Sequence, residues 1–415
     1  MSARLPRFGN LARTSILVMF WQGVRMSCLA AWIILGARVL GATSYGLFSG
    51  TVGTASALAG LAGLGGGMLM YQYSTADHTQ FPRYWKQSLL LCALSAVPLS
   101  LAFSLLTAGL MSWPALGLIA LSEIIAFPIV TNAAFAFSAN DRLGWAAALP
   151  ALNAAMRLAA ICIFDALPID HHLTAYLLLH LTSSACSAVL ALILVRRILR
   201  PGPASIQIGG SDLAHGTGHA AAWSSAIAVT TLDKSFVLHA GGSEIAGLYA
   251  ACYRIAAVIA MPLDAMVMSA MPRLFRAQRA SQYRRLIISM ILAATGYGTL
   301  GGIVLWCAAG VLPSLLGIEF SAAILGLQWM GLFVIGYSLR QIACHVLIGR
   351  GMKIHRFVIE ALGLVIMVMI AATWIPAHGL LGAVWMIIVA ETLMAVAAWL
   401  TVIFSRGREV SRVPG

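Results

Sequence analysis

Apolar residues fill long runs along this chain, and short polar segments separate one run from the next. Each run is close to the roughly 20 residues that an α-helix needs to cross about 30 Å of hydrocarbon. The pattern therefore predicts an all-α, polytopic membrane protein with twelve spans. They cover residues 14–37, 46–72, 87–110, 114–138, 144–164, 173–195, 220–240, 246–271, 286–311, 322–348, 356–375 and 379–404.

One polar break is longer than the others and divides the predicted spans six and six. It covers residues 196–219, which are rich in glycine and proline. We expect an N-terminal six-helix lobe over 1–195, a cytoplasmic linker over 196–219 and a C-terminal six-helix lobe over 220–415. An even number of spans gives both lobes the same orientation, as in parallel repeats. A Gly-Leu-aromatic sequence shared by 46–48 and 247–249 supports such a repeat.

Composition and charge agree with a membrane protein. Apolar residues make up 60% of the chain and charged residues only 9%, against about 25% charged in soluble domains. The net charge of +13 could suggest a nucleic-acid partner, but its placement excludes that interpretation. With both termini in the cytoplasm of a bacterial inner membrane, 20 of the 26 Lys and Arg residues fall in cytoplasmic segments and only Arg38 in an outside loop. This asymmetry follows the positive-inside rule.

No pattern in the sequence indicates an enzyme. The predicted outside loops have about ten residues or fewer, too few for a catalytic domain, and Walker, GxSxG and HExxH motifs are absent. The seven cysteines all fall in predicted spans without CxxC spacing, so we expect no metal site. We expect no bound cofactor either, with H⁺ or Na⁺ as candidate coupling ions.

Ten ionisable groups besides histidine lie inside the predicted spans. A charge near the centre of a span costs about 2.5–3.5 kcal/mol if it faces lipid, so these groups should face the interior, pair or line water. The basic members are candidates for binding an anionic head group, because arginine grips phosphate bidentately; they are Arg25, Arg157, Lys234, Arg254 and Arg340. Four acidic members are candidates for ion coupling: Glu123, Asp233, Asp264 and Glu391. The tenth, Glu360, is expected to be solvated near the cytoplasmic end of its span.

Several of these positions also fit a structural role. Lys234 and Arg254 lie near Asp233, which suits an ion pair between helices, and Asp264 follows Pro262 and could cap freed backbone. The glycine-rich stretch GLAGLGGGMLM (60–70) fits either close helix packing or a bending point. Charge is also divided unevenly, because basic groups outnumber acidic ones in the first lobe and the reverse holds in the second.

Four segments resemble the polysaccharide-exporter flippases of the multidrug/oligosaccharidyl-lipid/polysaccharide superfamily. They are ARVLGATSYGLF (37–48), TTLDKSFVLHAGGSEIAGLYAACYRIAAVIAMPLDAMVMSAMPRL (230–274), LPSLLGIEFSAAILGLQWM (312–330) and HGLLGAVW (378–385). The resemblance implies a two-lobed, V-shaped, MATE-like transporter that flips an undecaprenyl-diphosphate-linked oligosaccharide to the periplasmic leaflet. It implies motif positions at Asp233, Tyr253 and Arg254. The expected partners are the lipid-linked glycan, the bilayer and glycan polymerase or export machinery, with the chain itself a monomer.

Two other functions compete with a flippase. A cation-coupled multidrug exporter of the same superfamily should carry acidic cavity residues, against which Arg25 and Arg157 argue. A membrane glycan polymerase or ligase would need a sizeable periplasmic loop with catalytic polar residues, which the sequence lacks.

Overall fold

The computed structural model describes residues 8–168, 172–206, 208–276, 280–350 and 352–405. Within these residues the chain is helical, and one isolated bridge between Ala108 and Met111 is the only β-type pairing. The helices are α1 (Phe8–Ala59), α2 (Gly66–Ala76), α3 (Phe81–Leu106), α4 (Trp113–Ile119), α5 (Phe127–Ala139), α6 (Leu143–Ala166), α7 (Leu173–Leu194), α8 (Gly210–Arg276), α9 (Ala280–Ala308), α10 (Leu312–Leu316), α11 (Ile324–Gly349) and α12 (Lys353–Phe404). Short 3₁₀ or π-helical turns are η1 (Ala62–Gly65), η2 (His78–Gln80), η3 (Ala120–Ala126), η4 (Val195–Leu199), η5 (Ala309–Val311) and η6 (Ile318–Ala323).

Three of the helices are much longer than one membrane crossing, and each breaks at a glycine. Gly41 in α1 (φ 71°), Gly242 in α8 (φ 81°) and Gly379 in α12 (φ 55°) have left-handed or otherwise positive-φ backbone, which glycine adopts without a steric penalty. The breaks fall in or next to the predicted connections 37–46, 240–246 and 375–379. In the described residues, nine helical stretches are long and apolar enough to cross a membrane. Two crossings by each of the three long ones would give twelve, a number that stays a prediction.

The predicted second span, 46–72, is not one continuous helix. It is interrupted between α1 and α2, where Gly63, Leu64 and Gly65 all have positive φ. Ser95 Oγ accepts a hydrogen bond of 2.8 Å from the Gly63 N–H, and the backbone of Gly216 lies so close to Gly65 that a side chain there would clash. The predicted span is therefore interrupted, and the glycine-rich stretch serves both as a bend and as a close packing surface.

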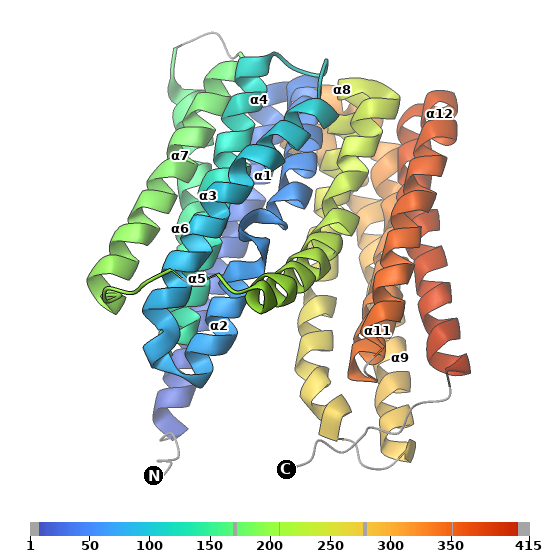
Figure 1. Cartoon of the computed structure of the whole chain (residues 1–415). Coiled ribbons are helices and arrows are strands. Elements are labelled where there is room, and N and C mark those ends of the chain that lie inside the picture. The colour runs from blue at the N-terminus through green and yellow to red at the C-terminus, as the bar shows by residue number, and fades with distance from the viewer. Residues whose placement is uncertain (1–7, 169–171, 207, 277–279, 351, 406–415) are drawn as a thin grey trace. The chain divides into compact units, whose positions relative to one another are not determined.

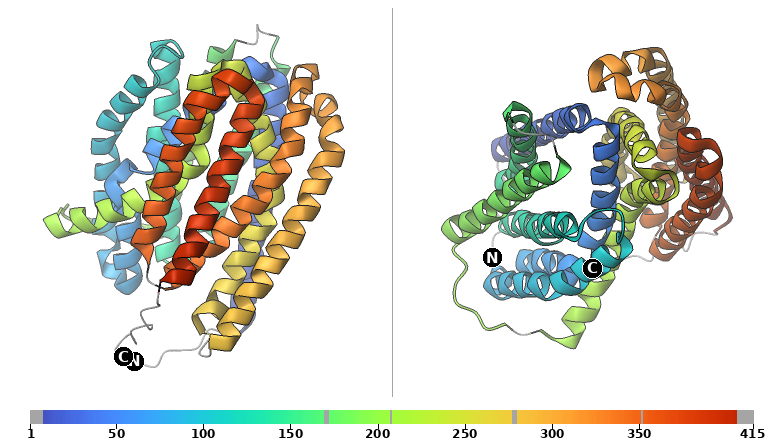
Figure 2. Two further views of the ribbon diagram at one scale, coloured as in Figure 1. Left: turned by 90° about the vertical axis from the view of Figure 1, so that its right-hand side faces the viewer. Right: turned by 90° about the horizontal axis from the view of Figure 1, so that it is seen from above.

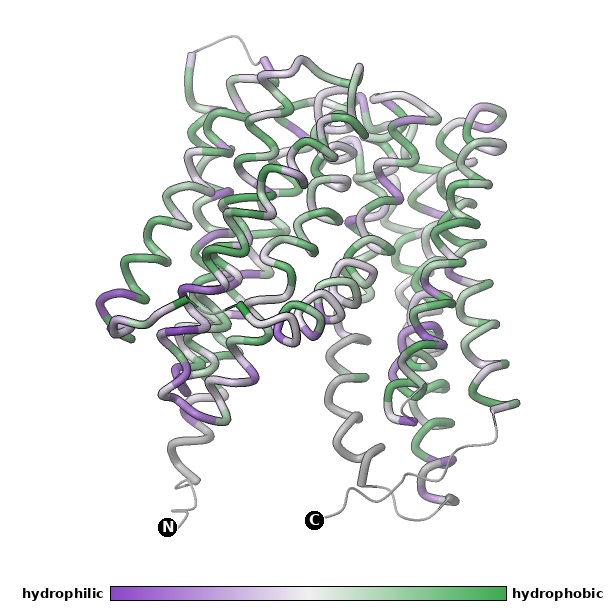
Figure 3. Tube along the Cα trace, in the orientation of Figure 1, coloured by the Kyte–Doolittle hydropathy of each residue, from purple (hydrophilic) through white to green (hydrophobic). Residues whose placement is uncertain are grey.

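The chain divides into two compact units. The first comprises the residues up to Leu40 together with Thr51–Ala228, and the second comprises Gly41–Gly50 with the residues from Val229 onwards. In the first unit α3, α5, α6 and α7 lie side by side (Figure 1), and Phe81, Trp85 and Phe137 are in its buried core. Figure 3 shows the apolar residues that run along these helices.

Part of the predicted linker packs against the first unit. Arg83 Nη2 lies 3.4 Å from Asp212 Oδ2 in an ion pair, and Lys86 Nζ donates to the Ala204 carbonyl at 3.1 Å. Ser224 donates to the Ala57 carbonyl at 2.7 Å. These contacts hold the beginning of α8 to α1 and α3, so the segment is more than a loose connection.

The second unit contains α9, α11 and α12, with α12 folded into a hairpin (Figure 2). The helix breaks at Gly379, and Gly363 before the break packs against Met394 after it. Near the other break, Gly46 and Gly247 are in backbone contact, and a Cβ on either would clash. Gly41 and Gly242 are separated in sequence by the same distance as Gly46 and Gly247, and they have nearly the same backbone angles. The repeated Gly-Leu-aromatic sequence therefore marks structurally equivalent helix breaks.

Candidate functional site

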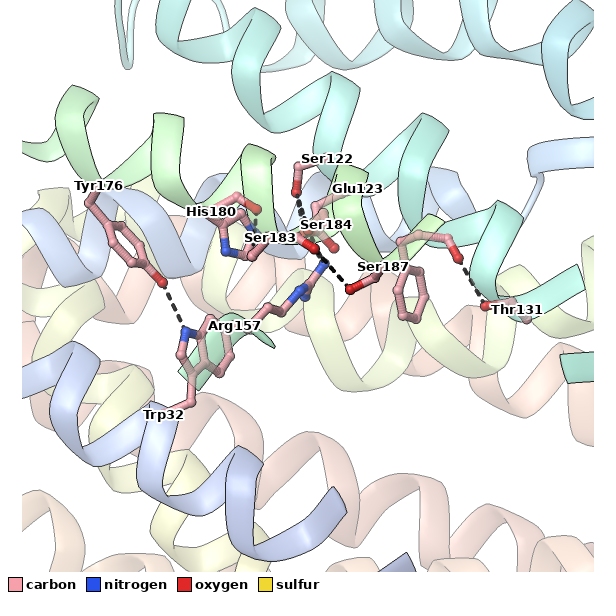
Figure 4. A network of polar contacts seen from close by, with 11 residues as sticks. Trp32, Ser122, Glu123, Thr131, Arg157, Tyr176, His180, Ser183, Ser184 and Ser187 are labelled. Atoms are coloured by element: carbon pink, nitrogen blue, oxygen red, sulfur yellow. Dashed lines mark hydrogen bonds and ion pairs between the residues drawn. The ribbon is translucent and has the colours of Figure 1, made fainter. Parts of the chain in front are cut away.

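The first unit holds a buried charged cluster built from three elements. Glu123 lies on the π-helical turn η3, Arg157 on α6 and His180 on α7. All three residues are at most 8% exposed. A π-helical turn inside a helix is uncommon and often occurs at functional sites, and here it places the Glu123 carboxylate among the other two groups (Figure 4).

One carboxylate oxygen organises this cluster. Glu123 Oε1 lies 2.6 Å from Arg157 Nη2 and 2.9 Å from His180 Nε2, and it accepts a 2.8 Å hydrogen bond from Ser122 Oγ. Arg157 Nη2 also donates to Ser184 Oγ at 3.3 Å. A buried charge is tolerated when it is paired and hydrogen-bonded, so Arg157 and Glu123 neutralise each other rather than facing lipid.

Sequence reasoning missed His180 and its aromatic surroundings. The imidazole of His180 stacks on the indole of Trp32 (ring centroids 6.1 Å apart), and Trp32 Nε1 donates to Tyr176 Oη at 2.9 Å. Tyr176, His180 and Ser184 recur every four residues on α7, which puts them on one face of the helix. That spacing was the available signal, but it is weaker than a charge inside a span.

In the second unit, Asp233 and Lys234 form a buried ion pair on α8. Lys234 Nζ lies 2.7 Å from Asp233 Oδ1 and 3.0 Å from Oδ2, and it donates to the Thr230 carbonyl at 2.9 Å. The Tyr253 ring centroid lies 3.4 Å from the same ammonium, a cation–π contact. Tyr249 Oη donates to Asp233 Oδ2 at 2.7 Å.

A second set of charges joins α11 to α12. Arg340 holds Glu391 with two hydrogen bonds, of 2.5 Å from Nε and 3.2 Å from Nη2. Glu360 lies 3.8 Å from Arg340 and accepts a 2.8 Å hydrogen bond from Arg356. Glu360 is only 4% exposed, so the expectation that it is solvated is wrong. Its neighbour Arg356, one turn earlier, provides the missing counter-charge.

The remaining predicted residues differ in their surroundings. Arg254 donates to Ser49 Oγ at 3.4 Å and lies over the Tyr45 ring. Asp264 is on α8, but its side chain lies outside the described part of the structure. Arg25, on α1, is half-buried and makes no hydrogen bond or ion pair with any described residue.

Pairing changes the interpretation of the unequal charge distribution. In the second unit Asp233, Glu360 and Glu391 each have a basic partner. The negative charge of these three carboxylates is therefore balanced. The structure brings together Glu123 with Arg157, Asp233 with Lys234, and Glu391 with Arg340. Whether any of these groups binds substrate or a coupling ion stays a prediction.

The fold is that of the MATE transporters. An inward-facing multidrug resistance MATE family transporter of the MOP superfamily is 14% identical, with a TM-score of 0.75 over 91% of this chain and 96% of its own. An outward-facing structure of such a transporter is 15% identical, with a TM-score of 0.62 over 94% and 93%. A MOP superfamily transporter from Pyrococcus furiosus, whose binding pocket is described as having reverse polarity, is 14% identical, with a TM-score of 0.61 over 94% and 93%.

The sequence itself identifies the family. Residues 11–278 match the family described as polysaccharide biosynthesis protein, and this chain belongs to that family. No curated protein matches the chain. The protein is thus a multi-pass membrane protein of the polysaccharide biosynthesis family with a MATE-like transporter fold, as the resemblance in its sequence predicts.

Proposed function

We propose that this protein is a flippase that moves an undecaprenyl-diphosphate-linked oligosaccharide from the cytoplasmic to the periplasmic leaflet by alternating access. Two findings support the proposal: the polysaccharide biosynthesis family and the MATE-like transporter fold. The first supports a glycan as the substrate, and the second supports transport as the activity. The protein would act in a bacterial inner membrane, with both termini in the cytoplasm, alongside glycan polymerase or export machinery.

The surroundings of Arg25 are the observation that favours an anionic head group on the substrate. The other four predicted basic residues are engaged: Arg157, Lys234 and Arg340 by carboxylates, and Arg254 by a serine hydroxyl and a tyrosine ring. Arg25 lies within the first apolar stretch of α1 without a partner among the described residues. An unpaired guanidinium inside a span is costly, and a diphosphate would neutralise it with bidentate hydrogen bonds.

Ion coupling completes the proposed mechanism. A carboxylate that exchanges its basic partner for H⁺ or Na⁺ would link ion entry to a conformational change, because the exchange alters which helices are held together. Glu123 and Glu391 each join two or more separate helices through their ion pairs. They are therefore the stronger coupling candidates, whereas Asp233 pairs with its own neighbour in the chain.

Substitution of Arg25 tests the proposed substrate contact. We expect Arg25→Ala to lower polysaccharide export by roughly tenfold or more, the loss that corresponds to about 1.4 kcal/mol of binding, while Arg25→Lys retains part of it. Export should be measured by complementation and normalised to the amount of protein in the membrane. Arg38→Ala is the matched control, since Arg38 is an exposed arginine on the same helix. Equal export by the Arg25→Ala and Arg38→Ala variants would remove Arg25 from the substrate site.

A multidrug exporter is the second candidate, because the structural relatives include multidrug resistance transporters. An organic cation needs an uncompensated carboxylate in the transport path. The carboxylates Glu123, Asp233, Glu360 and Glu391 are all paired with basic groups in the described structure, which favours the flippase. Efflux of an organic cation from vesicles that contain the purified protein would support the exporter instead.

A further inference from the structure

The surroundings of the Lys234 ammonium are those of a small cation. Its Nζ has three oxygen neighbours within 3.0 Å: both carboxylate oxygens of Asp233 and the Thr230 carbonyl. The Tyr253 ring covers it at 3.4 Å. A lysine ammonium has three N–H donors and no acceptor, so these three oxygens satisfy it completely.

The same groups would suit a monovalent metal ion. Carboxylate and carbonyl oxygens are the ligands that hard cations prefer, and an aromatic face adds attraction for any cation. The Asp233 carboxylate is held in place independently of Lys234, because Tyr249 Oη donates to its Oδ2. Asp233 is completely buried and Lys234 is 5% exposed, so neither charge is compensated by bulk water.

Three arginines of the second unit have partners other than Asp233. Arg340 is held by Glu391, and Arg356 by Glu360. Arg254, on the same segment as Tyr253, directs its guanidinium to Ser49 and Tyr45. Among the described side chains, Lys234 is therefore the group that neutralises Asp233.

The geometry points to Lys234 as a covalently attached cation that occupies a monovalent-cation site at Asp233. Lys234 keeps Na⁺ out of this site, and transport does not depend on Na⁺ binding at Asp233. The statement about transport rests on the proposed function, whereas occupancy of the site by Lys234 does not depend on it. It assigns Lys234 a role in ion selectivity instead of substrate binding.

Removal of the ammonium should open the site to an external ion. Lys234→Met keeps the side chain as far as the ε position and removes the ammonium group with its charge. We expect the purified full-length variant to have a lower Tm in choline chloride than wild type, and to regain several degrees in a saturable manner when Na⁺ replaces choline at constant ionic strength. This rise should exceed any Na⁺-specific rise of wild type, which would report Na⁺ at another carboxylate such as Glu123 or Glu391. A Lys234→Ala variant should be rescued in the same way by n-propylammonium, whose cation replaces the missing one.

Two controls separate this site from general salt effects. Asp233→Asn combined with Lys234→Met removes both charges and should abolish the response to Na⁺. Lys86→Met removes a lysine of the first unit that donates to a backbone carbonyl and should leave the Tm insensitive to the choice of cation.

Three results would overturn the inference: no cation-specific rise beyond that of wild type in the Lys234→Met and Lys234→Ala variants, the same rise in the double variant, or a Na⁺-specific stabilisation of wild type that Asp233→Asn abolishes. The comparison of wild type with Asp233→Asn can still overturn the inference if both Lys234 variants fail to fold. Because Tm is measured without a glycolipid, these outcomes are independent of whether the protein proves to be a flippase.

Discussion

At the residue scale, the structure changes what a substitution of Arg157 should do. From the sequence alone, Arg157 is a candidate for binding the anionic head group. In the structure Arg157 neutralises buried Glu123 at 2.6 Å. Loss of one partner of a buried ion pair typically costs about 3–5 kcal/mol, because the other charge remains in a low-dielectric interior.

We therefore expect Arg157→Met to destabilise the first unit strongly, and Glu123→Gln combined with Arg157→Met to be closer to wild type. The double variant leaves no unpaired charge, and His180 and Ser122 can still hydrogen-bond to a glutamine. Thermal unfolding of the purified protein in detergent measures both effects. Equal destabilisation in the single and double variants would show that the pair contributes little beyond its packing.

The charged positions of the candidate site were predictable from sequence, but their partners were not. A charge stands out in an apolar span because of its cost, so Glu123, Arg157, Arg340 and Glu391 were found. Their pairing depends on how separate helices are rotated and stacked, which hydropathy does not encode. His180 was missed because histidines were not counted among the charged groups of the spans.

At the scale of elements, positive-φ residues determine where the long helices break. The break between α1 and α2 is unusual because it contains Leu64, a residue with a side chain, at φ 47°. Such a conformation costs about 1–2 kcal/mol for an L-residue. Contacts around the break, including that of Gly65 with Gly216, must offset this cost.

Substitution of Gly65 tests whether the break is required. Gly65→Ala should destabilise the protein by about 1 kcal/mol or more, because alanine disfavours φ 74° and its Cβ would meet the Gly216 backbone. The control is Gly117→Ala in α4, where no atom lies within 4 Å of an added Cβ and alanine is the better helix former. Thermal unfolding should show a lower Tm for the first variant and an unchanged or higher Tm for the second. The opposite order would mean that the left-handed turn is dispensable.

Hydropathy predicted the nine long apolar helical stretches of the described residues, because each crossing has a required length. The connections at Gly41, Gly242 and Gly379 were likewise close to their predicted places. Hydropathy left open whether the stretch at 60–65 bends, because glycine also occurs at packing surfaces inside transmembrane helices. That interruption depends on contacts with the Ser95 hydroxyl and with Gly216, which are distant in sequence.

At the scale of the whole molecule, family and fold support the same type of function. The polysaccharide biosynthesis family covers residues 11–278, and the MATE-like fold extends over more than 90% of the chain. Equivalent helix breaks at Gly41 and Gly242 fit two repeats of one transporter architecture. A flippase accounts for these features together with Arg25, which has no partner among the described residues.

The most direct test of this account is the distribution of the lipid-linked oligosaccharide between the two membrane leaflets after depletion of the protein. Spheroplasts should be treated with a membrane-impermeant reagent that labels the periplasmic glycan, and the total pool should be quantified in parallel. The account predicts that the periplasmic fraction falls while cytoplasmic-leaflet material accumulates, and that wild-type protein, but not the Arg25→Ala variant, restores the distribution. An unchanged distribution in depleted cells would contradict it.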